Sequence, residues 1–353
     1  MWGKTSLPLV PGNASLSNMN IGSSFNRRKF LTAVPAALAA SYASTQANPS
    51  IPDPARKTLK NPIVYRFEIG DIEAFSISDG TLRFGSPAVM MYPEDQRPLM
   101  KTVLEQEVEP TDYIPCYINV LVLRWGKEVA VIDPGFGPDS RPRFGWLADG
   151  LAQIGITPGQ VTASFLSHAH IDHIGGLVTG GKPAFPNAAM YVLQTELDFW
   201  FGKDPDFSQS HRSPGELPGL IKGNREKFEI LKPQTQTVKD GVVLFDGRIT
   251  ISAAPGHTAG HAVFRIESKG QTLLHIADLV HHSILMFHDP NWIIGLDHHP
   301  AASVASRKRI FQKESGLKTR LFGFHLPWPG LGHVAQIGTG YRWLPESIRW
   351  ENT

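Results

Sequence analysis

Three histidines and an aspartate lie within six consecutive residues of the stretch "SHAHIDHIGG", which covers residues 167–176. They form the pattern His-x-His-x-Asp-His, with His168, His170, Asp172 and His173. Neutral imidazoles and carboxylates are suitable ligands for Zn²⁺ and other first-row divalent ions. An apolar, strand-like segment precedes the cluster, and in a continuing strand the first two histidines would point to the same side. The pattern therefore indicates a metal site rather than a polar loop that happens to be rich in histidine.

Three more residues of ligand type follow strand-like segments later in the chain. They are His257 in "PGHTAGH", Asp278 in "LLHIADL" and His325 in "LFGFHLPWPG". A buried carboxylate without a partner would be costly, so Asp278 is expected to have one. The four clustered residues alone could complete one tetrahedral zinc site. The three later residues favour a site with more metal than that.

Composition limits what else the chain can do. It has 353 residues, 34 basic and 32 acidic, and a net charge of +2, which gives no electrostatic case for nucleic-acid binding. The single cysteine, Cys116, excludes an intrachain disulfide framework and a cysteine-rich zinc module. We expect Cys116 to be a small buried residue beside a strand. Any metal must therefore be held by histidines and carboxylates.

The first 47 residues resemble a twin-arginine export signal. Arg27 and Arg28 precede Lys-Phe-Leu, and small and apolar residues follow over 32–43. This run of about 12 residues is too short to cross a bilayer as a helix. We therefore expect a signal peptide over 1–47 that engages the twin-arginine export machinery, a linker over 48–61 and one folded domain over 62–353. The protein would then be periplasmic or secreted, without a stable membrane anchor.

The rest of the chain shows the periodicities of strands and helices. Period-two segments predict strand pairs with turns at Gly70-Asp71, Gly126-Lys127, Asp246-Gly247 and Lys269-Gly270. Helices are predicted within 143–155, after a strand within 188–200 where Thr195 is the expected cap, and over 300–315. Residues 84–112 are expected to form a long loop, and 319–325 a final strand. Gly175 and Gly176 should allow a tight turn or a close backbone approach near the histidine cluster. Paired strands interleaved with helices suggest two sheets faced by helices.

The order of these residues resembles that of the metallo-β-lactamase superfamily. Its motifs match Asp133 at a strand end, the 168–173 cluster, His257, Asp278 and His325, and the resemblance covers roughly residues 62–353. It implies an α+β fold, the four-layer αββα sandwich. Five stretches are similar to the methyl parathion hydrolase-like branch: "AFPNA" (184–188), "ELDFW" (196–200), "MFHDP" (286–290), "HLPWPGLGHV" (325–334) and "GYRWLP" (340–345).

The resemblance also implies a centre of two divalent metal ions, zinc first, with Mn, Co or Fe as alternatives. One ion would be held by His168, His170 and His257, and the other by Asp172, His173 and His325. Asp278 would bridge the two ions, which makes it the residue closest to the chemistry, and Asp133 would support the cluster without binding metal. A hydroxide shared by the ions would attack an ester-like bond. The substrate would be a small organophosphate triester, aryl ester or lactone.

Other residues are assigned less directly. His261 is expected to make structural hydrogen bonds, and His275 and His333 to have structural roles. His281 and His282 are candidates for the substrate pocket, where they depart from the apolar pattern of the methyl parathion hydrolase-like branch. Trp200 and Trp328 are candidates for an apolar leaving-group pocket, with plain core packing as the alternative for each. His298 and His299 are expected to face solvent.

Two other functions remain to be distinguished from hydrolysis. Some proteins of this fold use iron for redox chemistry on thiols, and a third class would bind metal without catalysis. The complete set of seven ligand positions, Asp172 included, favours the hydrolase. The sequence leaves the oligomeric state open, a homodimer included.

Overall fold

The computed structural model describes residues 61–349. The predicted signal peptide, 1–47, and all but the last residue of the predicted linker lie outside the described residues. Export and localisation therefore stay predictions. Within residues 61–349, no helix is both long enough and apolar enough to cross a membrane.

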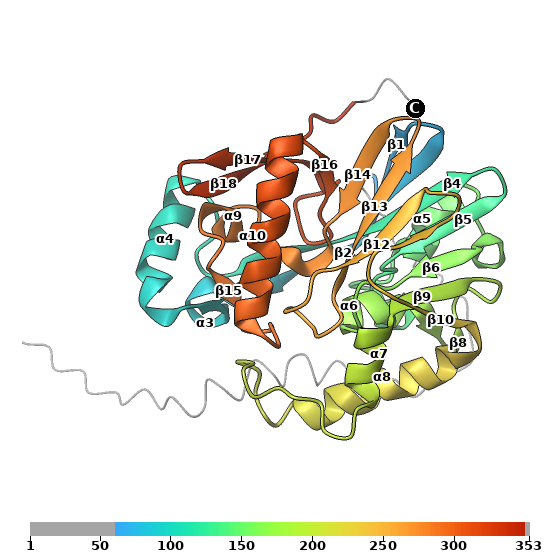
Figure 1. Cartoon of the computed structure of the whole chain (residues 1–353), viewed down its shortest axis with the longest axis horizontal. Coiled ribbons are helices and arrows are strands. Elements are labelled where there is room, and N and C mark those ends of the chain that lie inside the picture. The colour runs from blue at the N-terminus through green and yellow to red at the C-terminus, as the bar shows by residue number, and fades with distance from the viewer. Residues whose placement is uncertain (1–60, 350–353) are drawn as a thin grey trace, which may run out of the picture. The chain divides into compact units, whose positions relative to one another are not determined.

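The strands of the first half of the chain form a seven-stranded sheet (Figure 1). In spatial order its strands are β1 (Val64–Ile69), β2 (Ile72–Phe84), β4 (Ile114–Trp125), β5 (Glu128–Ile132), β6 (Ala163–Phe165), β9 (Ala189–Leu193) and β10 (Thr235–Val238). The first four strands pair antiparallel, and β5, β6, β9 and β10 pair parallel. Gly70 and Gly126 have positive φ angles of 60° and 53°, which confirms the two predicted turns.

The second half forms another sheet of seven strands. In spatial order these are β11 (Val242–Leu244), β12 (Ile249–Ala253), β13 (Ala262–Ser268), β14 (Gln271–His275), β16 (Arg320–Phe322), β17 (Leu331–Ile337) and β18 (Gly340–Pro345). All pairs are antiparallel except β14 with β16. Two small ribbons pair β3 (Met91–Tyr92) with β15 (Ile293–Ile294) and β7 (Val178–Thr179) with β8 (Lys182–Pro183).

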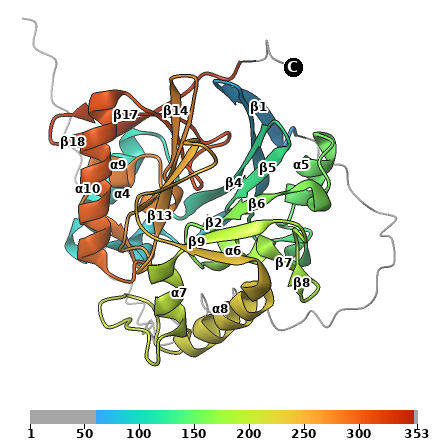
Figure 2. The same ribbon diagram turned by 45° about the vertical axis from the view of Figure 1, so that its right-hand side comes forward.

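Helices cover the outer faces of both sheets, as Figure 2 shows. The helices of the described residues are α3 (Pro87–Met90), α4 (Arg97–Gln106), α5 (Leu147–Gln153), α6 (Ile171–Ile174), α7 (Gln194–Phe201), α8 (Leu217–Leu231), α9 (Leu285–His288) and α10 (Pro300–Leu317). Apolar side chains of α5, α7 and α8 pack on the first sheet, and those of α4, α9 and α10 pack on the second. A third apolar cluster lies between the sheets. The predicted four-layer αββα sandwich is confirmed.

Successive side chains of one strand point to opposite faces of the sheet, so a single strand contributes to two apolar layers. In β4, Val120 and Val122 face the helices, whereas Leu121 and Leu123 face the other sheet. Each is completely buried, and burying such a side chain contributes about 1.5–3 kcal/mol. A strand buried on both faces reads as a continuous apolar run, as "INVLVL" does.

The expectation of a loop over residues 84–112 was wrong, because this segment contains α3, β3 and α4. Met100, Val103 and Leu104 of α4 are buried against the second sheet at the three- and four-residue spacing of a helix. Pro98 made the segment resemble a loop. It stands in the first turn of α4, where the missing N–H is not needed.

Two further element predictions need correction. Thr195 does not cap α7, because the cap position is Leu193 and Thr195 lies inside the first turn. The strand predicted over 319–325 is only β16, and it is not the final strand, because the β17–β18 hairpin follows it. The helix predicted over 300–315 and the turns near Gly247 and Gly270 are confirmed.

Candidate metal centre

Loops that follow strands of both sheets bring the seven predicted ligands together. His168 and His170 follow β6, and α6 carries Asp172 and His173 immediately afterwards. The other three stand where β12, β14 and β16 give way to loops: His257, Asp278 and His325. Gly176 lets the first of these loops pass beneath the end of β5, since a Cβ on it would lie 2.0 Å from the Pro134 carbonyl oxygen.

The ligand atoms form two groups with Asp278 between them. His168, His170, His257 and Asp278 make one group, and Asp172, His173 and His325 make the other. Within each group the atoms lie within 4.8 Å of one another. Asp278 Oδ1 is 3.0 Å from His173 Nε2, and Oδ2 is 3.2 Å from His257 Nε2. The arrangement matches the predicted division into two sites, and the role of these residues as ligands stays a prediction.

The donor atoms fit a cation better than they fit one another. His170 Nδ1 lies 2.9 Å from His168 Nε2 and 2.8 Å from His257 Nε2, and a single proton cannot satisfy three converging nitrogen atoms. His173 Nε2 and Asp278 Oδ1 are buried and close, yet neither has a hydrogen-bond partner. Converging lone pairs on imidazoles and a carboxylate are what a divalent metal ion requires. The residues present therefore fit the implied ions.

Acceptors hold the outward ring nitrogens of four of the five candidate histidine ligands. The contacts are His168 Nδ1 to Ser167 Oγ (2.9 Å), His173 Nδ1 to Asp133 Oδ2 (3.0 Å), His257 Nδ1 to Asp297 Oδ1 (2.8 Å) and His325 Nδ1 to the Tyr117 carbonyl oxygen (2.9 Å). Such contacts fix the tautomer and the ring orientation, so that the other nitrogen presents its lone pair to a metal.

Asp133 belongs to neither group of ligand atoms and instead supports the loop that carries the histidines. Its Oδ1 accepts the Ser167 N–H at 2.8 Å, while Oδ2 faces His173. Burial would raise the pKa of Asp133, but the facing His173 holds it below its usual value. Asp133 therefore remains an anion that orients His173.

Glu196 supports the centre from a distance, and sequence reasoning did not assign it this role. Its buried carboxylate accepts hydrogen bonds from Ala169 N (2.9 Å), Trp200 Nε1 (2.8 Å), Thr258 Oγ1 (2.6 Å) and Gly260 N (2.9 Å). Ala169 lies between two candidate ligands, and Thr258 follows another. Glu196 thus ties the loop after β6 to the loop after β12. Burial raises its pKa, and the four hydrogen bonds counteract that rise.

Asp297 and Cys116 also contact candidate ligands, His257 and His325, and the sequence did not reveal either contact. Asp297 is buried and holds His257, 40 residues away in the chain. Cys116 is buried in β4 as expected, but its Sγ also lies 3.0 Å from His325 Nδ1. Its surroundings are therefore not purely apolar.

The remaining histidines near Asp278 have separate roles. His261 Nδ1 lies 2.9 Å from the Ala254 carbonyl oxygen, and its Nε2 accepts the Asp278 N–H at 3.1 Å, so this residue makes the expected structural hydrogen bonds. His281 Nε2 is 3.1 Å from Asp278 Oδ2. His282 is also buried, and its Nδ1 accepts the Ile284 N–H at 3.1 Å.

Three aromatic predictions change in the structure. Trp200 is completely buried and donates to Glu196, so it packs in the core instead of lining a pocket. Trp328 packs edge-on against Tyr65 in the layer between the sheets. His298 is buried rather than solvated, because Phe207 covers it with ring centroids 4.5 Å apart. His299 is exposed as expected.

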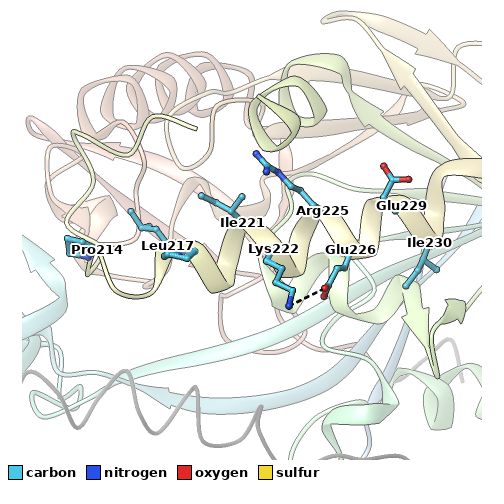
Figure 3. Close-up of a pocket in the computed structure, with 9 residues that line it drawn as sticks. Pro214, Leu217, Ile221, Lys222, Arg225, Glu226, Glu229 and Ile230 are labelled. Atoms are coloured by element: carbon cyan, nitrogen blue, oxygen red, sulfur yellow. Dashed lines mark ion pairs between the residues drawn. The ribbon is translucent and has the colours of Figure 1, made fainter. Parts of the chain in front are cut away.

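A wide groove of about 920 Å³ lies elsewhere, along the outer face of α8 (Figure 3). Leu217 and Ile221 line it together with the ion pair of Lys222 and Glu226, which is 3.8 Å long. None of the seven candidate ligands borders this groove. Its size therefore does not make it the reaction site, because the groups capable of chemistry lie in the metal centre.

Zinc affinity is expected to rise with pH. Burial alone would lower the pKa of His173, but three surrounding carboxylates, Asp278 foremost, raise it to about 10. The pKa of His325 is also raised well above its usual value, against the effect of burial. Zinc must displace these protons, so its affinity should increase about tenfold per pH unit for each proton released. Competition with a chromophoric chelator between pH 6 and 9 measures the slope, and a flat profile would contradict the assignment.

Asp297→Asn is expected to weaken zinc binding by about 10- to 100-fold, because asparagine cannot hold the His257 N–H with a negative charge. The same chelator competition measures the loss. Asp246→Asn is the matched control, since Asp246 is exposed in a turn with positive φ that asparagine tolerates. Equal zinc affinity in the two variants would show that Asp297 does not support the centre.

Comparison with known proteins agrees with this geometry. The sequence model of the family described as "Metallo-beta-lactamase superfamily" matches residues 113–323. The N-acyl homoserine lactonase AttM of Azorhizobium caulinodans is 31% identical over 126 residues, which cover 35% of this chain and 43% of AttM. AttM of Rhizobium johnstonii is 31% identical over 131 residues, or 36% and 45% of the two chains. The aligned stretch thus spans less than half of these curated relatives.

Solved structures match over a greater length. AidC, described as a dizinc quorum-quenching lactonase in complex with a product, is 30% identical with a TM-score of 0.78. The match covers 82% of this chain and all of AidC. AbOPH, described as a hydrolase in the beta-lactamase superfamily, is 25% identical with a TM-score of 0.73, over 82% of this chain and all of AbOPH.

Proposed function

Because this chain belongs to the metallo-beta-lactamase superfamily, we propose that it is a two-metal hydrolase that opens the ring of N-acyl homoserine lactones. The observation that carries the proposal is the complete donor set: Asp278 belongs to the first group of ligand atoms, and its Oδ1 is 3.0 Å from His173 of the second. The similarity to AidC over all of that lactonase supports the substrate class. Two zinc ions are the proposed cofactors.

When bound, two divalent ions lower the pKa of a shared water and polarise the carbonyl that is attacked. The side chains of the protein hold the donor atoms of the candidate ligands in position. Asp278 stands between the two groups, and Asp133 and Asp297 fix the rings of His173 and His257. These supports hold the donor atoms in place before a substrate arrives, which lowers the reorganisation needed during reaction.

His281 is the uncharged side chain beside Asp278 that we propose contacts the lactone. Its Nε2 is 3.1 Å from Asp278 Oδ2, and its buried Nδ1 has no hydrogen-bond partner. Burial lowers the pKa of His281 to about 4, so the ring is neutral near pH 7. A neutral imidazole offers one N–H and one lone pair. Because the N–H on Nε2 faces the Asp278 carboxylate, Nδ1 keeps the lone pair and can accept a hydrogen bond from the substrate.

Phosphotriesters and aryl esters rank below lactones as proposed substrates. The similarity to the methyl parathion hydrolase-like branch rests on sequence stretches such as 325–334. Trp200 and Trp328, the aromatics expected in an apolar leaving-group pocket, pack in cores instead. Their absence from the centre favours a substrate with an alkyl chain and a small ring. The proposed site of action is outside the cytoplasm, on the strength of the signal-like segment over 1–47.

A substrate panel tests the proposal. Zinc-loaded protein is assayed with N-hexanoyl homoserine lactone, p-nitrophenyl acetate and a dialkyl aryl phosphotriester. We expect kcat/KM for the lactone to exceed the others by roughly 100-fold or more. Hydrolysis of the phosphotriester alone would reverse the ranking. Oxygen consumption with a thiol, and bound iron in place of zinc, would instead support the redox alternative.

A further inference from the structure

The segment between α7 and α8 is held at three points, one of which is a candidate metal ligand. It covers residues 202–216 and joins the two helices at the edge of the fold seen in Figures 1 and 2. Phe207 packs against His298, and His211 stacks on Tyr92 with ring centroids 3.7 Å apart and planes 10° from parallel. Between these anchors and α8, Arg212 Nη2 reaches to 2.8 Å from His170 Nε2.

Arg212 is a cation without a matching anion. Within residues 61–349, no carboxylate oxygen lies within 4.0 Å of a guanidinium nitrogen of Arg212, the limit for an ion pair. Glu216, Asp172 and Asp297 interact with Arg212 only at longer range. Its Nε is buried and has no hydrogen-bond partner. Arg212 as a whole is only partly buried, but a buried Nε–H without an acceptor is costly, so this position needs a reason other than stability.

The contact with His170 is incompatible with the role of His170 as a ligand. The other four candidate histidine ligands turn their outward nitrogens to groups that can accept a hydrogen bond. His170 alone turns its outward nitrogen to a guanidinium, which can only donate. If the Nδ1 lone pair of His170 binds a metal ion, its Nε2 must carry the proton. Two donors would then face each other at 2.8 Å, and the positive metal would add repulsion.

Metal loading should therefore detach Arg212 from His170 and leave a free guanidinium beside the centre. Hydrolysis of a lactone creates a carboxylate from the carbonyl carbon that is attacked, and a guanidinium binds a carboxylate through two parallel hydrogen bonds. We propose that Arg212 binds the carboxylate of the ring-opened N-acyl homoserine, on the His170 side of the metal centre. This inference rests on the proposed function and names the residue that recognises its product.

Equilibrium binding tests the assignment without turnover. Zinc-loaded full-length protein is titrated calorimetrically with N-hexanoyl homoserine and with the carboxamide of the same compound, which lacks the negative charge. We expect wild-type protein to bind the acid at least about tenfold more tightly than the amide. Arg212→Gln should abolish this preference, and Arg212→Lys should retain part of it, because lysine keeps the charge but not the planar fork.

Lys203→Gln is the control, since it removes one positive charge from the same segment at an exposed position. It should leave the acid preference intact, and all variants should hold the same amount of zinc. An Arg212→Gln variant that still prefers the acid overturns the assignment, and so does wild-type protein that binds the amide as well as the acid or binds neither. Lactone turnover is measured separately. Turnover without an Arg212 effect contradicts only the role of Arg212, whereas no turnover contradicts the proposed function.

Discussion

Asp278→Ala is expected to remove metal binding and hydrolysis together. The Asp278 carboxylate lies between the two groups of ligand atoms, because Oδ1 faces His173 and Oδ2 faces His257 and His325. Without it, the first group holds imidazoles alone, and Asp172 is the one carboxylate left in the second. A loss of about 4 kcal/mol in transition-state stabilisation corresponds to a roughly 1,000-fold fall in kcat/KM. Zinc analysis and lactone turnover on the same sample measure both effects.

Asp198→Ala is the matched control for this variant. Asp198 is exposed on α7, and its only described side-chain hydrogen bond is with Gln194. It should keep two zinc ions and full turnover. An Asp278→Ala protein that retained lactone hydrolysis would show that the reaction occurs elsewhere.

Glu196→Ala is expected to have the largest effect on stability. It leaves three N–H groups and one hydroxyl without their acceptor in the interior, at Ala169, Trp200, Thr258 and Gly260. Breaking such a buried charged network costs about 3–5 kcal/mol. Denaturant unfolding of the metal-free protein measures the loss. Zinc affinity should fall as well, because Ala169 separates two candidate ligands.

Glu196→Gln distinguishes the effect of the side chain's volume from the effect of its two hydrogen-bond-accepting oxygens. The amide keeps the volume but replaces one oxygen by an NH₂ group, which cannot accept the hydrogen bonds made at that position. We expect a smaller but clear loss of unfolding free energy, about 1–3 kcal/mol. If both variants unfold at the same denaturant concentration as wild type, Glu196 does not tie the two loops together.

The sequence predicted which seven residues come together, partly because four of them are close in the chain and partly through the resemblance to the superfamily; their role as ligands stays a prediction. His168 to His173 lie side by side in the chain, and His257, Asp278 and His325 each follow an apolar strand. Period-two patterns likewise predicted the strands of the two sheets, because each strand is a short stretch of consecutive residues.

Residues that act through distant contacts were harder to predict. Asp297 meets His257 across 40 residues, and Arg212 meets His170 across 42, so no local pattern joins them. Glu196 offered one usable signal: it is a carboxylate on a short helix that also carries Leu197, Phe199 and Trp200, and a buried carboxylate needs partners. His298 was misjudged because the residue that covers it, Phe207, belongs to an irregular segment with no periodicity.

Two ions, held on either side of Asp278, are proposed to make this protein a lactonase. The most direct test is the turnover of N-hexanoyl homoserine lactone as zinc is added stepwise to metal-free protein. We predict that activity rises until two zinc ions are bound per chain and then stays constant. No hydrolysis at two equivalents, or full activity at one, would contradict the claim.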